Sequence, residues 1–167
     1  VTAKSLLATS PDVCIIATGA VPRVPDLPGI GGANVVTAWD VLSGKVKLNG
    51  EKVIVAGGGT VGCETAEFLA DGNEVTIVEM LPAVATDMEM VHMVAFMTRL
   101  AGLKIRVITE AVIQSFDKKG LVYKDREGRK QSLAGTKIVL AMGSVSSRGL
   151  AEALKGKVPE LYCIGDA

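Results

Sequence analysis

Residues 52–62 read KVIVAGGGTVG, and residues 74–79 read EVTIVE. Each segment contains an apolar run typical of a buried strand, and the glycines at 57, 59 and 62 follow the spacing Gly-x-Gly-x-x-Gly. The pattern predicts a strand over 52–56, a tight turn, a helix over 60–70 ended by Asp71-Gly72, and a strand over 74–79. A strand, helix and strand in this order indicate a parallel sheet.

The three glycines of this turn have different physical tasks. Gly57 permits the tight turn out of the strand, Gly59 lets a pyrophosphate approach the backbone, and Gly62 lets the helix pack closely on the sheet. The helix start presents unpaired N–H groups and a partial positive charge. The residues predicted to bind the phosphates are therefore Gly57, Gly58, Gly59, Thr60, Val61 and Gly62.

An acidic residue, Glu79, ends the second strand, about 20 residues after the glycines as the dinucleotide fingerprint requires. A carboxylate here accepts hydrogen bonds from the adenosine ribose and repels a 2′-phosphate. Met80 and the two residues after it supply no arginine to receive such a phosphate. We therefore expect NAD(H) rather than NADP(H), with Glu79 and Met80 at the adenosine end. A glycine turn without a ligand is the alternative, which the position of Glu79 disfavours.

Composition narrows the function further. Lys+Arg and Asp+Glu number 18 each among 167 residues, so the net charge is zero and a nucleic-acid partner is not expected. No apolar run approaches the ~18 residues of a membrane span, and a cytoplasmic location is the default. Cys14, Cys63 and Cys163 have neither metal-ligand nor redox spacing and are expected to pack as small hydrophobes. We expect no metal site and name no catalytic residue.

The remaining chain predicts further strands and three more helices around this unit. Residues 20–32, rich in proline and glycine, indicate a connection. Strands are expected over 12–19, 103–108, 111–116, 120–124, 130–133, 137–141 and 161–164, and helices over 37–42, 87–101 and 150–154. The predicted fold class is α/β: a Rossmann-like NAD(P)-binding domain, with a parallel sheet, helices on both of its faces and a β-meander.

Motifs on either side of the glycine turn add a resemblance. Ala17-Thr18-Gly19 ends the first strand, and LYCIGD (161–166) ends the last. In this order the chain resembles flavoprotein reductases in which an NAD(P)H domain is inserted into an FAD domain. The resemblance implies that Ala17, Thr18 and Gly19 form the crossover between the domains and that Gly165 and Asp166 contact FAD. It also implies that Ala141, Met142 and Gly143 close over the nicotinamide nucleotide.

Residues 57–70 and 75–81 resemble the C-terminal part of 2,4-dienoyl-CoA reductase and of NADH:flavin oxidoreductases of the old-yellow-enzyme type. The resemblance implies a piece of a larger enzyme, in which NADH delivers hydride to FAD, and whose FMN-binding barrel and iron–sulfur cluster lie outside this chain. The implied division is 1–30 as FAD-domain fragment and hinge, 31–156 as NAD(P)H domain, and 157–167 as FAD-domain fragment. The isolated chain is expected to be inactive, and its residues 12–19 and 161–166 either pair with each other or fray.

Alternatives to this interpretation remain. One is a fragment of an NADH oxidase or of a ferredoxin-type reductase, which share the same module. Another is an NAD-sensing module without enzymatic activity, and a third is a folded domain that binds nothing measurably. Glu64, one turn into the helix, is open as well: in related reductases such a residue approaches the nicotinamide, whereas a solvated side chain near the helix start is the alternative.

Overall fold

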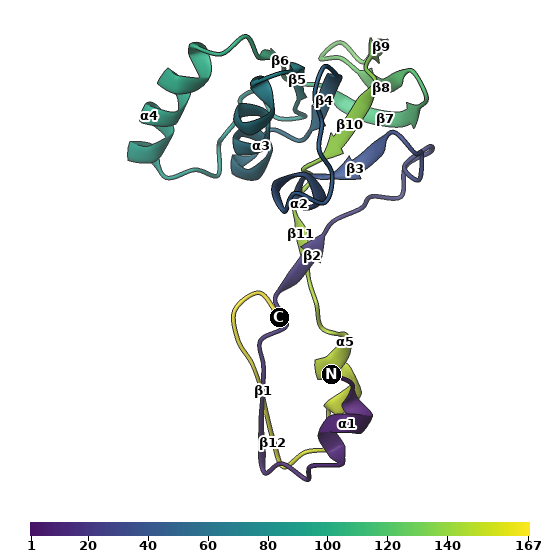
Figure 1. Ribbon diagram of the computed structural model, residues 1–167, viewed down its shortest axis with the longest axis vertical. Coiled ribbons are helices and arrows are strands. Elements are labelled where there is room, and N and C mark those ends of the chain that lie inside the picture. Colours follow the sequence, from purple (N-terminus) through teal and green to yellow (C-terminus); the bar gives the residue numbers. More distant parts are fainter. The chain divides into compact units, whose positions relative to one another are not determined.

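The computed structural model describes all residues, 1–167, and divides into two compact units (Figure 1). The larger unit is formed by Arg23–Gly143, and the smaller one by Val1–Pro22 together with Ser144–Ala167. Each unit has its own buried cluster of hydrophobic side chains, and each is described by itself below.

The larger unit is built on a five-stranded parallel sheet of order β3-β10-β4-β5-β6. Its strands are β3 (Val35–Thr37), β4 (Lys52–Ala56), β5 (Glu74–Val78), β6 (Arg106–Ile108) and β10 (Lys137–Leu140). In the middle of the sheet Val55 pairs with Ile77 of β5 on one side and with Val139 of β10 on the other. All three side chains are at most 1% exposed, as expected for central strands of a parallel sheet.

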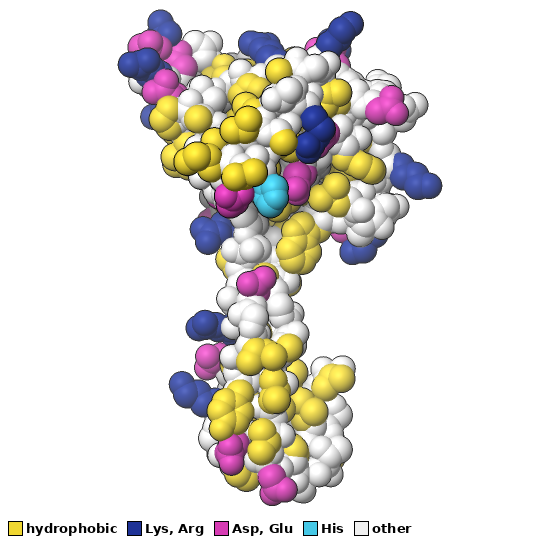
Figure 2. Space-filling view, turned by 90° about the vertical axis from the view of Figure 1, so that its left-hand side faces the viewer, with side chains coloured by type: hydrophobic (Ala, Val, Ile, Leu, Met, Phe, Trp, Pro, Cys, Tyr) yellow, Lys and Arg dark blue, Asp and Glu magenta, His cyan; other side chains and the backbone are white.

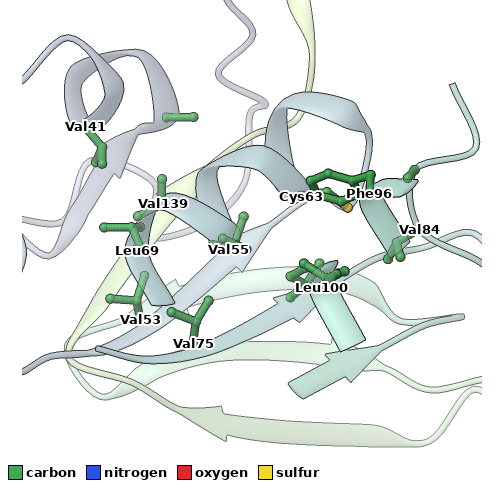
Figure 3. Close-up of a cluster of buried hydrophobic side chains, with 14 residues drawn as sticks. Val41, Val53, Val55, Cys63, Leu69, Val75, Val84, Phe96, Leu100 and Val139 are labelled. Carbon is green, nitrogen blue, oxygen red and sulfur yellow. The ribbon is translucent and has the colours of Figure 1, made fainter. Parts of the chain in front are cut away.

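Helices cover one face of this sheet. They are α2 (Ala38–Leu42), α3 (Thr60–Ala70) and α4 (Met90–Ala101). Figure 3 shows the cluster between them, where Val41, Leu69 and Phe96 from the three helices meet valines of β4, β5 and β10. The buried face of α3 carries small side chains, Cys63 and Ala66, so the helix lies close to the strands.

A three-stranded antiparallel meander covers the other face. Its strands are β7 (Val112–Asp117), β8 (Gly120–Lys124) and β9 (Lys130–Ala134). Ile113, Phe116 and Leu121 of the meander pack with Ile54 and Ile138 of the sheet. The predicted α/β, Rossmann-like fold is thus confirmed, with one correction: the helices lie on one face, because the meander already buries the apolar side chains of the other.

The smaller unit pairs the two ends of the chain. Strand β1 (Val13–Ile16) lies parallel to β12 (Glu160–Cys163), and β2 (Ala20–Pro22) lies antiparallel to β11 (Ser144–Ser146). Helices α1 (Ala3–Leu7) and α5 (Gly149–Leu154) pack on β1 and β12 through a small core of Cys14, Ile16, Ala151, Leu154 and Ala167. Of the two expected outcomes for these end segments, pairing is therefore the one observed.

The two compact units have other bounds than the predicted division into domains, which stays a prediction. Residues 23–30 belong to the larger unit, since Leu27 and Ile30 pack against its meander-side core. Residues 144–156 belong to the smaller unit, since α5 supplies Leu154 to its core. The predicted breaks at 30 and 156 came from the family resemblance, which does not report on which core a segment covers.

Several short elements were not predicted. The helix α1 and the strands β2, β3 and β11 have three to five residues each, too few for a periodic pattern. Helix α4 begins at Met90 instead of Asp87, because Glu89 is its N-cap residue and the Asp87 side chain bonds elsewhere. None of the helices is long and apolar enough to cross a bilayer.

Candidate dinucleotide-binding site

The glycine turn follows β4 at the carboxyl end of the sheet. Gly57 has φ +108°, in the region that favours glycine, and donates its N–H to the carbonyl oxygen of Val78 at 2.9 Å. A Cβ on Gly57 would collide with the carbonyl group of Ala141, which follows β10. The turn is therefore held between the ends of the two strands that neighbour β4.

Helix α3 begins directly after the turn and packs tightly on it. Gly59 is its N-cap residue and Gly62 lies in its first turn. A Cβ on Gly62 would overlap the carbonyl oxygen of Gly57 and lie 2.9 Å from the carbonyl carbon. Because these contacts are with backbone atoms, a larger residue at position 62 could fit only if the helix moved away from the turn.

Glu79 ties the end of β5 to the glycine turn. Its side chain is 7% exposed; Oε2 accepts the N–H of Gly58 at 2.6 Å and Oε1 accepts the N–H of Leu81 at 2.7 Å. A carboxylate oxygen can accept more than one hydrogen bond, so both oxygens retain acceptor capacity. The carboxylate thus shapes the turn and still has lone pairs available for a ligand.

A cavity of about 380 Å³ opens beside the turn, within the size range of small-molecule sites. Among the predicted site residues, it brings together Gly57, Gly59, Glu79, Met80, Ala141, Met142 and Gly143. Gly58 and Gly62 are buried behind its wall, while Thr60 and Val61 lie outside it on the first turn of α3. Two segments far apart in the sequence, 57–80 and 141–143, therefore line one cavity.

Other lining residues were not predicted. They are Pro25, Leu27, Val78, Ala111, Val112 and Ile113. Ala111 is positioned by its N–H, which donates to the carbonyl oxygen of Glu79 at 2.9 Å. The sequence did predict a strand that starts at residue 111. Only the structure shows that its first residues, 111–113, line the cavity next to Glu79.

The residues predicted to form the crossover and to contact FAD lie in the smaller unit. Since β1 and β12 are parallel and Ile16 pairs with Cys163, Ala17-Thr18-Gly19 and Gly165-Asp166 follow the two strands at the same end. Thr18 Oγ1 donates to the carbonyl oxygen of Ser147 at 2.6 Å, and the N–H of Ser147 donates to Gly19 at 2.8 Å. The side chain of Asp166 is exposed.

A second, more polar cavity lies between α3 and α4. Glu64, Asp87, His92 and Arg99 are among the residues that line it, and Glu64 is absent from the lining of the first cavity. Figure 2 shows the single histidine, His92, at the surface with acidic side chains beside it; Glu89 Oε2 lies 3.6 Å from its Nδ1.

Cys63 lies under the glycine turn and yields a first prediction. It is fully buried, its Sγ donates to the carbonyl oxygen of Gly58 at 3.3 Å, and burial raises the pKa of the thiol to about 11. At pH 8 only about one thiol in a thousand is then the reactive thiolate. We expect iodoacetamide to label exposed Cys163 in the native protein and to leave Cys63 unlabelled, as measured by mass spectrometry of peptides.

Two checks accompany this labelling experiment. A Cys163→Ser variant should show no rapid labelling, and unfolding in urea should make the remaining cysteines reactive. Labelling of native Cys63 as fast as Cys163 would contradict the burial of the thiol.

Parallel strands, a glycine turn that opens a helix, and an acidic residue at the end of the next strand define the class of Rossmann-like dinucleotide-binding proteins. Comparison with protein-family models agrees and is more specific, since one model matches residues 3–166. The chain belongs to the pyridine nucleotide-disulphide oxidoreductase family.

The curated relatives and the solved structure described next are named as an oxidase or as reductases. The chain is 41% identical to an NADH oxidase of Thermoanaerobacter brockii over 99% of its own length, and 33% identical to a metal reductase of Desulforamulus reducens over 92%. A 2-naphthoyl-CoA reductase structure matches 99% of this chain at 33% identity, with a TM-score of 0.91. The chain spans about a quarter of these proteins: 26% and 27% of the two relatives and 25% of the reductase.

Proposed function

We propose that the larger unit binds NADH as the nicotinamide-nucleotide half of a flavin-dependent oxidoreductase. One observation carries the proposal: the cavity beside the glycine turn brings Glu79 and residues 141–143 to the same space as Gly57 and Gly59. These are the residues that the dinucleotide fingerprint and the family resemblance select independently. Membership in a family of pyridine-nucleotide oxidoreductases supports the same reading.

The residues present fit a dinucleotide. Gly59 leaves the backbone accessible at the start of α3, an 11-residue helix whose first N–H groups attract a diphosphate. Glu79 would receive the adenosine ribose hydroxyls, and Met80 would cover the adenosine end. The apolar cavity wall formed by Ala111 and Ile113 suits the flat face of a base.

Glu79 also supports NADH over NADPH. Its carboxylate is buried and already accepts two backbone N–H groups, so it cannot turn away to admit a 2′-phosphate. Residues 80–82 contain no arginine or lysine that would offset the extra charge. Like charges placed together at a binding surface cost several kcal/mol.

For the smaller unit we propose a piece of an FAD domain. Support comes from Ala17-Thr18-Gly19 and Gly165-Asp166, which the pairing of β1 with β12 brings to one end of this unit. Bound NADH supplies a hydride, and FAD would accept it. The missing FAD and FMN-barrel domains would be the partners of this chain in a cytoplasmic enzyme, and the isolated chain would not turn over.

The activity of the parent enzyme has two candidates. The resemblance of residues 57–81 to 2,4-dienoyl-CoA reductase favours an old-yellow-enzyme-like reductase, and the similar structure is itself an acyl-CoA reductase by name. The relative with 41% identity is called an NADH oxidase, which favours that alternative. Both candidates use the same nucleotide site, so the binding experiment below applies to each.

Calorimetric titration tests the nucleotide assignment. We expect NADH to bind with a Kd at least about tenfold lower than that of NADPH, since a tenfold difference needs only about 1.4 kcal/mol. Tighter binding of NADPH would refute the assignment to NADH. Absence of binding by either nucleotide would favour the alternative of a folded domain without measurable affinity.

A further inference from the structure

The N-terminal end of α3 contacts a carboxylate from a residue outside the helix, Asp87. Asp87 Oδ1 accepts the N–H of Thr60 at 2.8 Å and the Thr60 hydroxyl at 3.0 Å. Its Oδ2 would lie 3.1 Å from a Cβ placed on Gly59. The carboxylate thus borders the bare backbone of Gly59, where a diphosphate would approach.

Helix α3 lacks an anion of its own at this end. Its N-cap residue, Gly59, makes no side-chain hydrogen bond, and no acidic residue lies in its first turn. A negative charge at a helix N-terminus is stabilising, and the unpaired N–H groups there can donate hydrogen bonds to either a carboxylate or a phosphate. Asp87, which is 27 residues from Thr60 in the sequence, therefore places its carboxylate at the N-terminus of α3, where an anion is favoured.

The connection between β5 and α4 delivers Asp87 to this position. Ala85 donates its N–H to the carbonyl oxygen of Gly58 at 2.7 Å, and Val84 packs so closely on Gly58 that a Cβ there would lie 2.7 Å from Val84 Cγ1. Ala85 is fully buried with φ +55°, a left-handed conformation that is unfavourable for a residue with a Cβ. Such strain is retained where surrounding contacts dictate it, as the contacts to the glycine turn do here.

We propose that Asp87 is an internal competitor for the diphosphate of the dinucleotide. This inference rests on the proposed function. In the ligand-free protein the Asp87 carboxylate holds the Thr60 N–H and hydroxyl, and a bound diphosphate takes over these donors while Asp87 turns to solvent. Asp87 is exposed, so its carboxylate is readily rehydrated when it leaves. The residue thereby lowers nucleotide affinity and favours release after hydride transfer.

The test compares three variants by calorimetry. Asp87→Asn keeps an oxygen acceptor but removes the charge, Asp87→Ala removes both, and Asp71→Asn makes the same charge change at the opposite end of α3. We expect Asp87→Asn and Asp87→Ala to bind NADH and ADP-ribose about two- to fivefold more tightly than the wild type, the range for one charge at a helix end. Adenosine, which has no phosphate, should bind equally to all, and Asp71→Asn should match the wild type.

The outcomes separate this inference from the proposed function. Unchanged NADH and ADP-ribose binding in both Asp87 variants would overturn the competitor role and leave the nucleotide site intact. Weaker binding of NADH and adenosine alike would also overturn it, since Asp87 would then only support the turn. If no variant and no wild-type protein bound NADH or ADP-ribose, the proposed function would fail and this inference with it.

Discussion

Replacing Glu79 by alanine should lower the free energy of unfolding by about 2–4 kcal/mol and abolish measurable NADH binding. The loss of stability follows from the two backbone N–H groups, of Gly58 and Leu81, that would be left without their acceptor in a buried site. The loss of binding has two physical causes: the ribose acceptor disappears, and the glycine turn loses the contact that shapes it. Urea unfolding and calorimetry measure the two effects.

Two further variants isolate the role of Glu79. Glu74→Ala removes a carboxylate from the other end of β5, where the exposed side chain pairs with Lys52 at 3.3 Å, and should change stability by less than about 1 kcal/mol. Glu79→Gln keeps the volume but replaces one acceptor by a donor facing a backbone N–H. Its effects should fall between those of the wild type and Glu79→Ala. If Glu79→Ala bound NADH like the wild type, Glu79 would not contact the ribose.

Replacing Gly62 by alanine should destabilise the larger unit by about 3 kcal/mol, the upper end of the usual cost of overpacking. The added methyl group would meet the carbonyl group of Gly57 and lie 3.3 Å from the Ala141 side chain. Backbone atoms cannot turn aside as a side chain can, so α3 would have to shift. Because that shift moves the helix start away from the cavity, NADH affinity should fall as well.

Trp39, the single tryptophan, lies in the larger unit, and its fluorescence during urea unfolding reports on this variant. Gly31→Ala is the matched control, because a Cβ at Gly31 meets no atom within 4 Å and its φ is not positive. It should change stability by less than about 0.5 kcal/mol. Equal stability of Gly62→Ala and Gly31→Ala would show that α3 does not pack as described.

The elements around the glycine turn could be predicted because their signals are local. The strand over 52–56 and the helix over 60–70 have the predicted bounds, since the apolar run, the glycines and Asp71-Gly72 mark both ends. The three strands of the meander were also predicted, with bounds within about one residue of those observed. By contrast β2, β3 and β11 are strands only through their partners, such as Val35 paired with Ile138, and no local signal predicts a partner.

The candidate site likewise has features that local sequence signals predict and features that depend on tertiary contacts. Glu79 could be selected from its position after an apolar run, and its use as a ribose acceptor remains a prediction. That it also accepts the N–H groups of Gly58 and Leu81 depends on how β5 ends against the turn. Asp87 had no distinguishing signal, because the sequence placed it only as the first residue of the helix predicted over 87–101, whereas its carboxylate accepts hydrogen bonds from Thr60 of another helix.

The sequence by itself determined the β4-α3-β5 unit, the glycine turn and the acidic residue after it, because each depends on residues within about 30 positions of one another. Only the tertiary structure decided which layer covers the second face of the sheet, that residues 141–143 and 111–113 line the same cavity, and that Asp87 occupies the start of α3. These features arise when distant segments bury a shared surface. The free energy of that burial depends on both segments together, so neither segment alone carries a sequence signal for it.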